Sequence, residues 1–193
     1  MARNKEFDVD TVLSKAMHVF WRQGYELTSM QDLVTHMGIH KRSMYDTFGD
    51  KHHLFMKVLD RYADIVESRM EQRIQVLPSA TEAIRLLFEM ALSKEEDEPM
   101  GCLIVNAAVE MSLHDPEVAS KVHERFENTE KILYELIKHG QESGEIPQHL
   151  DAIALSESLN NAFVGFRVMV KVIQDPSKLQ RIMDTTLRML QVT

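Results

Sequence analysis

The sequence predicts an all-α protein of about nine helices. No stretch alternates apolar and polar residues as a half-buried strand would, whereas apolar residues recur at helical spacing along all 193 residues. Gly and Pro number only 7 and 5, which argues against a loop-rich or disordered chain. A hydrophobic share of 44% is enough to build a real core. We expect a three-helix N-terminal unit followed by a larger helical body.

Three helices are predicted up to Phe48. The first begins near Asp8 and ends at Gly24, because Gly is the usual residue where a helix stops. Ser29 stands where an N-cap belongs, with an acidic residue three positions later at capping-box spacing. Gly38 ends this second helix, and a third short helix follows through Phe48.

Cap and proline signals divide the remainder into six further helices. Pro78 ends the fourth, while Asp115-Pro116 and Asp175-Pro176 are strong helix starts, with proline at the first helical position. The acidic run KEEDEP over 94–99 indicates a solvated loop. The six helices are expected over 50–77, 80–93, 101–114, 116–143, 151–174 and 176–190. We place a DNA-binding domain at 1–50 and a ligand-binding and dimerisation domain at 51–193.

Charge is distributed unevenly along the chain. The whole sequence has a net charge of −8, yet its first 53 residues carry seven basic and seven acidic side chains. All of the net negative charge therefore lies in the body, and five of the 9 His lie in the neutral N-terminal part. This electrostatic footprint is weaker than that of a strongly basic DNA-binding domain. It is compatible with a binder that releases its partner readily.

Several classes of function find no support in the sequence. No GxSxG, GxxxxGK[ST], GxGxxG or CxxC motif occurs, so we expect neither an enzyme nor a bound cofactor. With one Cys, no internal disulfide can form, and a reducing cytosol is expected. The chain shows no leader and no apolar run approaching the roughly 18 residues that span a bilayer. We expect a cytoplasmic protein without membrane contact.

The histidines do not suggest a metal site. His36 and His40 are four residues apart, but Gly38 turns the chain between them. His52 and His53 are adjacent, and we expect them to point apart on a helix. Without an HExxH pattern or further cysteines, we predict no metal.

The segment from 28 to 51 carries the functional prediction. A helix, a glycine turn and a second helix rich in hydrogen-bond donors have the shape that enters the DNA major groove. Lys41 and Arg42 are the best candidates to contact guanine edges. Asp46 would repel phosphates unless it accepts from cytosine or pairs with a nearby base, and both remain open. The alternative is an ordinary solvated helix face.

These residues resemble the TetR family of bacterial transcriptional regulators. The matching segments are FWRQGYELTS from Phe20 to Ser29, MGIHKRSMYDTFGDK from Met37 to Lys51, and Leu54. One departure is Val34, where the family commonly has Ala. The resemblance implies that Tyr45 and Lys51 bind phosphates. The full set of implied DNA contacts is Thr28, Ser29, Gln31, His40, Lys41, Arg42, Ser43, Tyr45, Thr47 and Lys51.

The resemblance also implies a ligand cavity in the body and a homodimer. Methionine and aromatic residues suit an adaptable pocket, although core packing explains many of them as well. The candidate lining is Phe88, Cys102, Met111, His114, Phe126, Phe163 and Phe166. The implied dimer uses the last two helices as a four-helix bundle. Its candidate residues are Leu159, Phe163, Gly165, Phe166, Leu179, Ile182, Met183 and Leu187.

The sequence thus predicts a ligand-responsive repressor that binds a near-palindromic double-stranded DNA operator as a homodimer and is released by an unknown small molecule. An activator of the same fold is one alternative. A thiol-based redox or electrophile sensor is another, because Cys102 lies at a helix start, where the dipole favours a thiolate. A helical interaction protein that has lost DNA binding is the third, favoured by the neutral N-terminal charge and Asp46.

Overall fold

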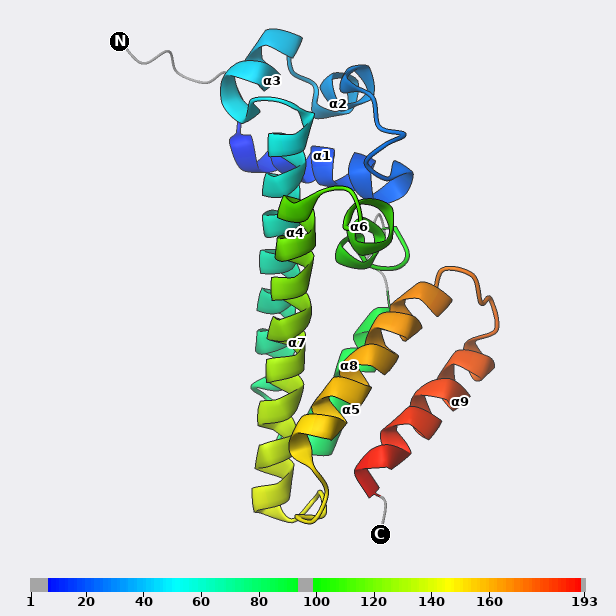
Figure 1. The fold of residues 1–193 in the computed structure, drawn as a ribbon. Helices are drawn as coiled ribbons and strands as arrows, with labels where there is room; N and C mark the ends of the chain where they lie inside the picture. The colour runs from blue at the N-terminus through cyan, green and yellow to red at the C-terminus, as the bar shows by residue number, and fades with distance from the viewer. Residues whose placement is uncertain (1–6, 94–98, 192–193) are drawn as a thin grey trace.

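A computed structural model describes residues 7–93 and 99–191. Within these ranges every regular element is helical, which confirms the predicted all-α class (Figure 1). The elements are α1 (Val9–Gln23), α2 (Met30–Met37), α3 (Lys41–Phe48), α4 (Lys51–Ile74), α5 (Ala80–Leu92), α6 (Leu103–Met111), α7 (Pro116–Ser143), α8 (Ala152–Met169), α9 (Pro176–Leu187) and a final 3-10 turn, η1 (Arg188–Gln191).

The chain forms a small head on an elongated body (Figure 1). Helices α1 to α3 make the head, and the long helix α4 leaves it and runs down the body. Arg125 of α7 pairs with Glu67 of α4, Nη1 to Oε1 3.1 Å, and Lys121 of α7 pairs with Asp60 of α4. These ion pairs join the two longest helices. The helix α6 lies under the head, where the body meets α1.

Two buried clusters fill the described residues. The first joins the head to α6 and the start of α7, and it includes α4 as far as Tyr62. The second begins on α4 at Met70 and packs α4, α5, α7, α8 and α9 together. The core therefore divides in the middle of α4. A domain boundary at residue 50 stays a prediction, but the head shares its core with α6 of the body.

Helix caps explain why the elements begin where they do. Ser29 Oγ accepts from the Asp32 N–H while the Asp32 carboxylate accepts from the Ser29 N–H, which completes the predicted capping box. Asp115 and Asp175 cap α7 and α9 in front of their prolines. The predicted box at Ser79 differs. Its hydroxyl donates to Glu145, 2.6 Å away, and Glu145 also accepts from the backbone of Ala80 and Thr81, so a distant carboxylate completes the start of α5.

The largest differences from the predicted helix bounds are at α8 and α6. We expected α8 to reach residue 174, but it ends at Met169, because the next N–H groups, of Lys171 and Val172, donate to carbonyls only three residues back. Helix α6 covers Leu103–Met111 rather than 101–114. Most of the predicted acidic loop, 94–98, lies outside the described residues. No helix in the described ranges combines the length and apolar character that crossing a membrane requires.

Most of the residues predicted for the dimer face are buried within the single chain. Six of these residues are buried inside this chain's own core, since they fill the space between α5, α8 and α9. They are Leu159, Phe163, Phe166, Leu179, Met183 and Leu187. Of the predicted set, only Gly165, which is exposed, and Ile182, which is half-buried, reach the surface of the single chain, and the dimer face itself stays a prediction. The outer side of α8 also exposes Ile153 and Val168, at 59% and 44%.

Candidate nucleic-acid interface and body cavity

A tight glycine turn joins α2 to α3. Gly38 adopts φ 70° and ψ 31°, the left-handed conformation that favours Gly, and its N–H donates to the Val34 carbonyl at 3.1 Å. Val34 packs against the head core despite its extra size. Met44 and Phe48 anchor α3 inward at 0% and 4% exposure, as predicted. The opposite side of α3 is thereby held outward on a rigid scaffold.

Most of the predicted DNA-contacting side chains reach the surface of the head. Ser29, Gln31, His40, Lys41, Arg42 and Tyr45 are exposed, while Ser43, Thr47 and Lys51 are half-buried. Thr28 is the exception, at 1% exposure. Its hydroxyl donates to the Gly24 carbonyl at 2.6 Å, so it holds the loop before α2 and is unavailable to DNA. The prediction of Thr28 as a contact is corrected accordingly.

Two contacts orient the cationic side chains of the interface. Arg42 Nε lies 3.7 Å from Asp46 Oδ2 one turn later on α3, with both side chains exposed. Asp46 therefore has a cationic partner when no DNA is bound. The Lys51 ammonium lies 4.2 Å from the centroid of the Tyr25 ring, a cation–π arrangement at the start of α4. That ring stacks in turn on Phe20 and packs against Phe55.

Two polar contacts tie the head to the body. The Glu110 carboxylate of α6 accepts from the backbone N–H groups of Tyr25 and Glu26, both at 2.9 Å. Gly24 adopts φ 81°, a conformation that favours Gly, and a Cβ there would lie 2.9 Å from this carboxylate, which would have to shift. His52 Nε2 of α4 lies 2.8 Å from Asp115 Oδ2, the cap of α7. No sequence motif signals either contact, because the partners are far apart in the chain.

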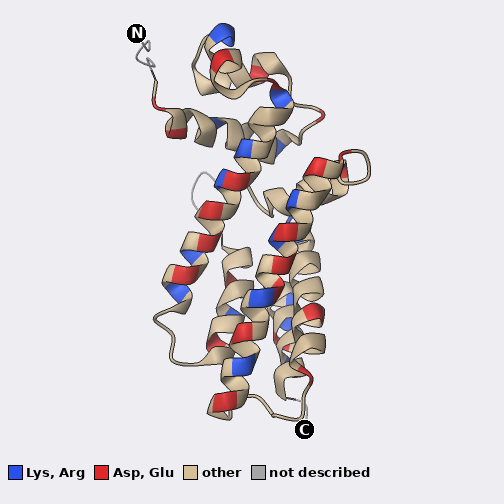
Figure 2. Cartoon of the chain, turned by 60° about the vertical axis from the view of Figure 1, so that its left-hand side comes forward, with Lys and Arg blue, Asp and Glu red and all other residues tan. Residues whose placement is uncertain are grey.

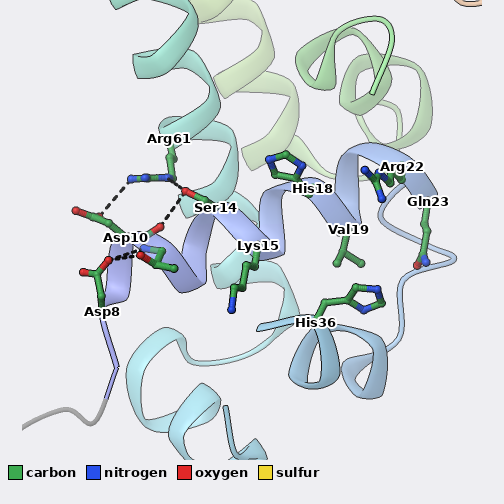
Figure 3. Close-up of a pocket in the computed structure, with 11 residues that line it drawn as sticks. Asp8, Asp10, Ser14, Lys15, His18, Val19, Arg22, Gln23, His36 and Arg61 are labelled. Carbon is green, nitrogen blue, oxygen red and sulfur yellow. Dashed lines mark hydrogen bonds and ion pairs between the residues drawn. The ribbon is translucent and has the colours of Figure 1, made fainter. Parts of the chain in front are cut away.

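A groove runs along α1 beside the turn (Figure 3). At one end Arg61 bridges Asp10 and Ser14, with Nη1 3.3 Å from Asp10 Oδ1 and Nε 2.8 Å from Ser14 Oγ. Toward the other end lie Lys15 and His36, and Lys15 Nζ is 3.9 Å from the position of a Cβ on Gly38. Basic side chains therefore adjoin the turn. The body instead interleaves acidic and basic residues along its helices (Figure 2).

A cavity of about 50 Å³ lies between α4, α6, α7 and α8. Of the predicted lining, Cys102, Phe126 and Phe163 surround it. Phe88 and Phe166 are buried behind Phe163; the Phe88 ring centroid lies 5.2 Å from that of Phe163 and 5.7 Å from that of Phe166.

Two other predicted lining residues lie elsewhere. Met111 belongs to the head cluster, and His114 is exposed just beyond the end of α6, because α6 ends sooner than expected. Seven polar residues that line the cavity were not among the predicted candidates. They are Tyr62, Glu67, Arg125, Asn128, Thr129, Asn160 and Arg167.

Arg167 and Cys102 meet at the wall of this cavity. Arg167 Nη1 donates to Cys102 Sγ at 2.9 Å, and the guanidinium carbon lies 4.4 Å from the Phe163 ring centroid. Burial by itself raises the pKa of the Cys102 thiol, but the Arg167 charge and a hydrogen bond with Tyr62 outweigh it and lower that pKa. Burial also raises the pKa of Tyr62 well above its ordinary value. The group can thus hold a thiolate beside a guanidinium.

Asp50, His52 and His53 are the one cluster of possible metal ligands among the described residues. The two histidines do not point apart as expected, since their ring centroids lie 6.0 Å apart in an edge contact. His53 Nδ1 lies 2.9 Å from Asp50 Oδ1, and His52 Nε2 faces Asp115. Because carboxylates of the chain already engage these nitrogens, we assign no metal to the cluster.

Comparison with known families accounts for both parts of the chain. Residues 12–58 match the family described as "Bacterial regulatory proteins, tetR family". Residues 80–186 match the family described as "Tetracyclin repressor-like, C-terminal domain". The first of these ranges contains α2, the turn and α3, and the second contains most of the body helices.

Individual relatives match along their whole length. The uncharacterized HTH-type transcriptional regulator YezE of Bacillus subtilis is 34% identical, over 98% of this chain and 100% of its own. The HTH-type transcriptional repressor ComR of Escherichia coli is 33% identical, over 97% and 90%. A solved structure of the regulator CifR with 26-bp operator DNA is 27% identical, with a TM-score of 0.86 over 96% of this chain and 98% of that one.

Proposed function

The chain belongs to the TetR family of bacterial regulatory proteins, and from this premise we propose that it is a transcriptional repressor that binds operator DNA as a homodimer and releases it on binding a small molecule. One observation carries the proposal: α3 is anchored by Met44 and Phe48 and presents Lys41, Arg42 and Tyr45 to solvent behind a glycine turn. An exposed donor-rich helix on a rigid scaffold suits the major groove.

On DNA, the side chains of α3 divide between bases and phosphates. Lys41 and Arg42 reach guanine edges, and Arg42 exchanges its contact with Asp46 for a bidentate contact with a base. Tyr45 and Lys51 bind phosphates and thereby set the register of α3 in the groove. Two-fold symmetry places two such helices about 34–36 Å apart, which predicts a near-palindromic operator.

The homodimer forms through the outer side of α8 and α9. Gly165 has no neighbouring atom within 4 Å of its built Cβ position, so a partner helix can approach closely there. Val168, one turn further along α8, is 44% exposed. Ile182 on α9 is half-buried and adds an apolar edge. These residues replace the buried set that the sequence pattern indicates.

Release follows from the contacts between body and head. A cavity of about 50 Å³ holds little more than water. A larger molecule therefore binds only a form in which α4, α6, α7 and α8 have moved apart. Because Glu110 of α6 accepts from the Tyr25 and Glu26 N–H groups, movement of α6 shifts the head. A ligand that prefers this form weakens DNA binding by the same factor.

The names of the relatives favour repression over activation. ComR of Escherichia coli and DhaR of a Mycobacterium strain are both named repressors, whereas FasR of Mycolicibacterium smegmatis is named an activator. ComR is the more similar and matches over nearly its whole length, so repression is the better supported choice. We propose a cytoplasmic regulator without enzymatic activity.

A second candidate function is thiol sensing at Cys102. The 2.9 Å contact from Arg167 favours it, because a guanidinium stabilises the reactive thiolate. Alkylation would remove the negative charge beside Arg167 and so disturb the start of α6. Timing the reaction of iodoacetamide with the intact protein tests this function. A rate no faster than that of a free cysteine peptide rejects it.

A gel-shift with the DNA upstream of the protein's own gene tests the proposed function. We expect specific binding that is weakened when Lys41, Arg42 and Tyr45 are each replaced by Ala. Lys131, exposed on α7, is the matched control, and Lys131→Ala should leave binding unchanged. Unchanged binding by the three α3 variants would instead point to an interaction protein that does not use this helix for DNA.

A further inference from the structure

The body cavity contains polar atoms without partners. Asn160 is only 8% exposed, and its Oδ1 accepts no hydrogen bond within the described residues. The Nε atoms of Arg125 and Arg167 are likewise buried and unpaired there. All three side chains line the cavity. Buried polar atoms are nearly always satisfied in folded proteins, so two donors and one acceptor at one cavity indicate a place for a polar ligand.

The charges at this cavity are unequal. Arg125 pairs with Glu67 and Asp60, at 3.1 and 3.5 Å. Arg167 instead has the Cys102 thiol and the Tyr62 hydroxyl as its neighbours, with no carboxylate among its pairs in the described chain. A guanidinium stays protonated in proteins, so its charge here is balanced at most by a thiolate. Beside the neutral Cys102 thiol, an anion is therefore favoured at Arg167, and a cation is disfavoured.

Apart from Glu67, which pairs with Arg125, and the uncharged Asn128 and Thr129, the remaining wall is apolar. Ile104, Ile132 and Val164 line the cavity with the rings of Phe126 and Phe163. The Phe163 ring also supports the Arg167 guanidinium by a cation–π contact. A ligand that fits this surface has a hydrophobic or aromatic body and a single charged end.

We propose that the effector of this regulator is a small organic acid with an apolar body, whose carboxylate binds Arg167 and whose hydroxyl or amide N–H donates to Asn160. This inference rests on the proposed function. The carboxylate replaces Cys102 Sγ as the partner of Arg167. Cys102 is the N-cap residue of α6, and Glu110 near the other end of α6 holds the head loop. Loss of the Arg167 contact therefore acts on the helix that positions the head.

The test uses the intact homodimer with matched pairs of probes. The acids are 3-hydroxybenzoate, 4-hydroxybenzoate and 4-hydroxyphenylacetate, each paired with its methyl ester. Calorimetry measures affinity, and a gel-shift on the operator measures release. At least one acid should bind at least tenfold more tightly than its ester and release the DNA. Esters that bind as tightly as the acids, or no binding by any acid, would overturn the inference.

Variants then test whether Arg167 and Asn160 bind the ligand. Arg167→Gln should weaken binding of the acid by about 10- to 100-fold, because hydrogen bonds to charged groups are the stronger ones. Arg167→Lys should restore part of it. Asn160→Leu should abolish the preference for a hydroxylated acid over its parent acid, and Lys131→Gln should change nothing. If Arg167→Gln and the unmodified protein bind the acid with equal affinity, Arg167 does not bind the carboxylate.

The two proposals fail in distinguishable ways. The ligand class is tested on the unmodified protein, by the ratio of its affinities for each acid and the matching ester. This test holds even if a variant does not fold. Operator binding that is intact but indifferent to every acid removes the ligand class and leaves the DNA-binding function standing. Absence of specific operator binding removes the proposed function, whatever the acids do.

Discussion

At the scale of single residues, the exposed side of α3 shows how local contacts prepare a binding surface. Asp46 appears unfavourable for DNA binding when only the sequence is considered. In the structure it lies 3.7 Å from Arg42 Nε, so the two exposed side chains form an ion pair one turn apart along α3. Thr28 shows the opposite case, because the side chain that the motif suggests as a contact serves the loop instead.

Replacing Arg42 by Ala should weaken specific operator binding by about 1–3 kcal/mol and relax the preference at one base pair. Fluorescence anisotropy with the operator and its single-base variants measures both effects. Lys131→Ala provides the control. An equal loss of affinity for the operator and all its variants would show that Arg42 contacts phosphate instead of a base.

Glu145 should make the protein acid-sensitive. Its hydrogen bonds from Ser79 and from the backbone of Thr81 lower its pKa to about 2 in the folded chain, from an ordinary 4.5. Because the folded pKa is the lower one, the stabilisation is complete above about 4.5 and is lost as the pH falls toward about 2.

The check is a pair of urea titrations at pH 7 and pH 4 with the Glu145→Gln variant. Glu145→Gln should lower the unfolding midpoint at pH 7 and reduce its decline between the two pH values. Glu142→Gln, on an exposed position of α7, is the control. An unchanged midpoint at pH 7 would show that the carboxylate does not stabilise the start of α5.

At the scale of elements, α6 is the connection between cavity and head. Its first turn carries residues at the cavity wall, and Glu110 near its end binds the loop between α1 and α2. The element bounds follow from local signals such as caps, glycines and prolines, so most of them could be predicted. The position of Glu110 could not, because its two partners are 85 and 84 residues away.

Glu110→Ala should loosen the head loop without unfolding the body. The amide protons of Tyr25 and Glu26 lose their acceptor, so their hydrogen exchange should accelerate by tenfold or more. Exchange measured by NMR reports each amide separately, with Glu124→Ala on α7 as the control. Unchanged protection of both amides would show that α6 does not hold the loop.

At the scale of the whole molecule, the residues that the family resemblance suggests for the dimer face mostly belong to the core of the single chain. Leu159 and Met183 recur at helical spacing like interface residues, yet both are 0% exposed within this chain. Hydrophobic spacing cannot distinguish a contact with a partner from a contact within the chain. Asn160 and Arg167 lie two turns apart on one face of α8, but they escaped prediction because only the packing of α4, α6 and α7 against that face makes a cavity there.

Gly165→Arg should convert the dimer to monomers. A Cβ at this position meets no atom of its own chain within 4 Å, so the protomer should tolerate the side chain. Sedimentation velocity should show half the mass, with unchanged helical circular dichroism. Ser120→Arg, exposed on α7, is the control. A variant that remains dimeric would place the interface elsewhere.

The most direct measurement of the central claim is the binding of the intact protein to the DNA upstream of its own gene, at salt concentrations from 50 to about 200 mM. We predict a near-palindromic site occupied by one dimer, with affinity that falls steeply as salt rises, because Lys51 and the other cationic side chains of the two heads displace counterions from phosphates. Binding without sequence preference, or by a single chain, would contradict it.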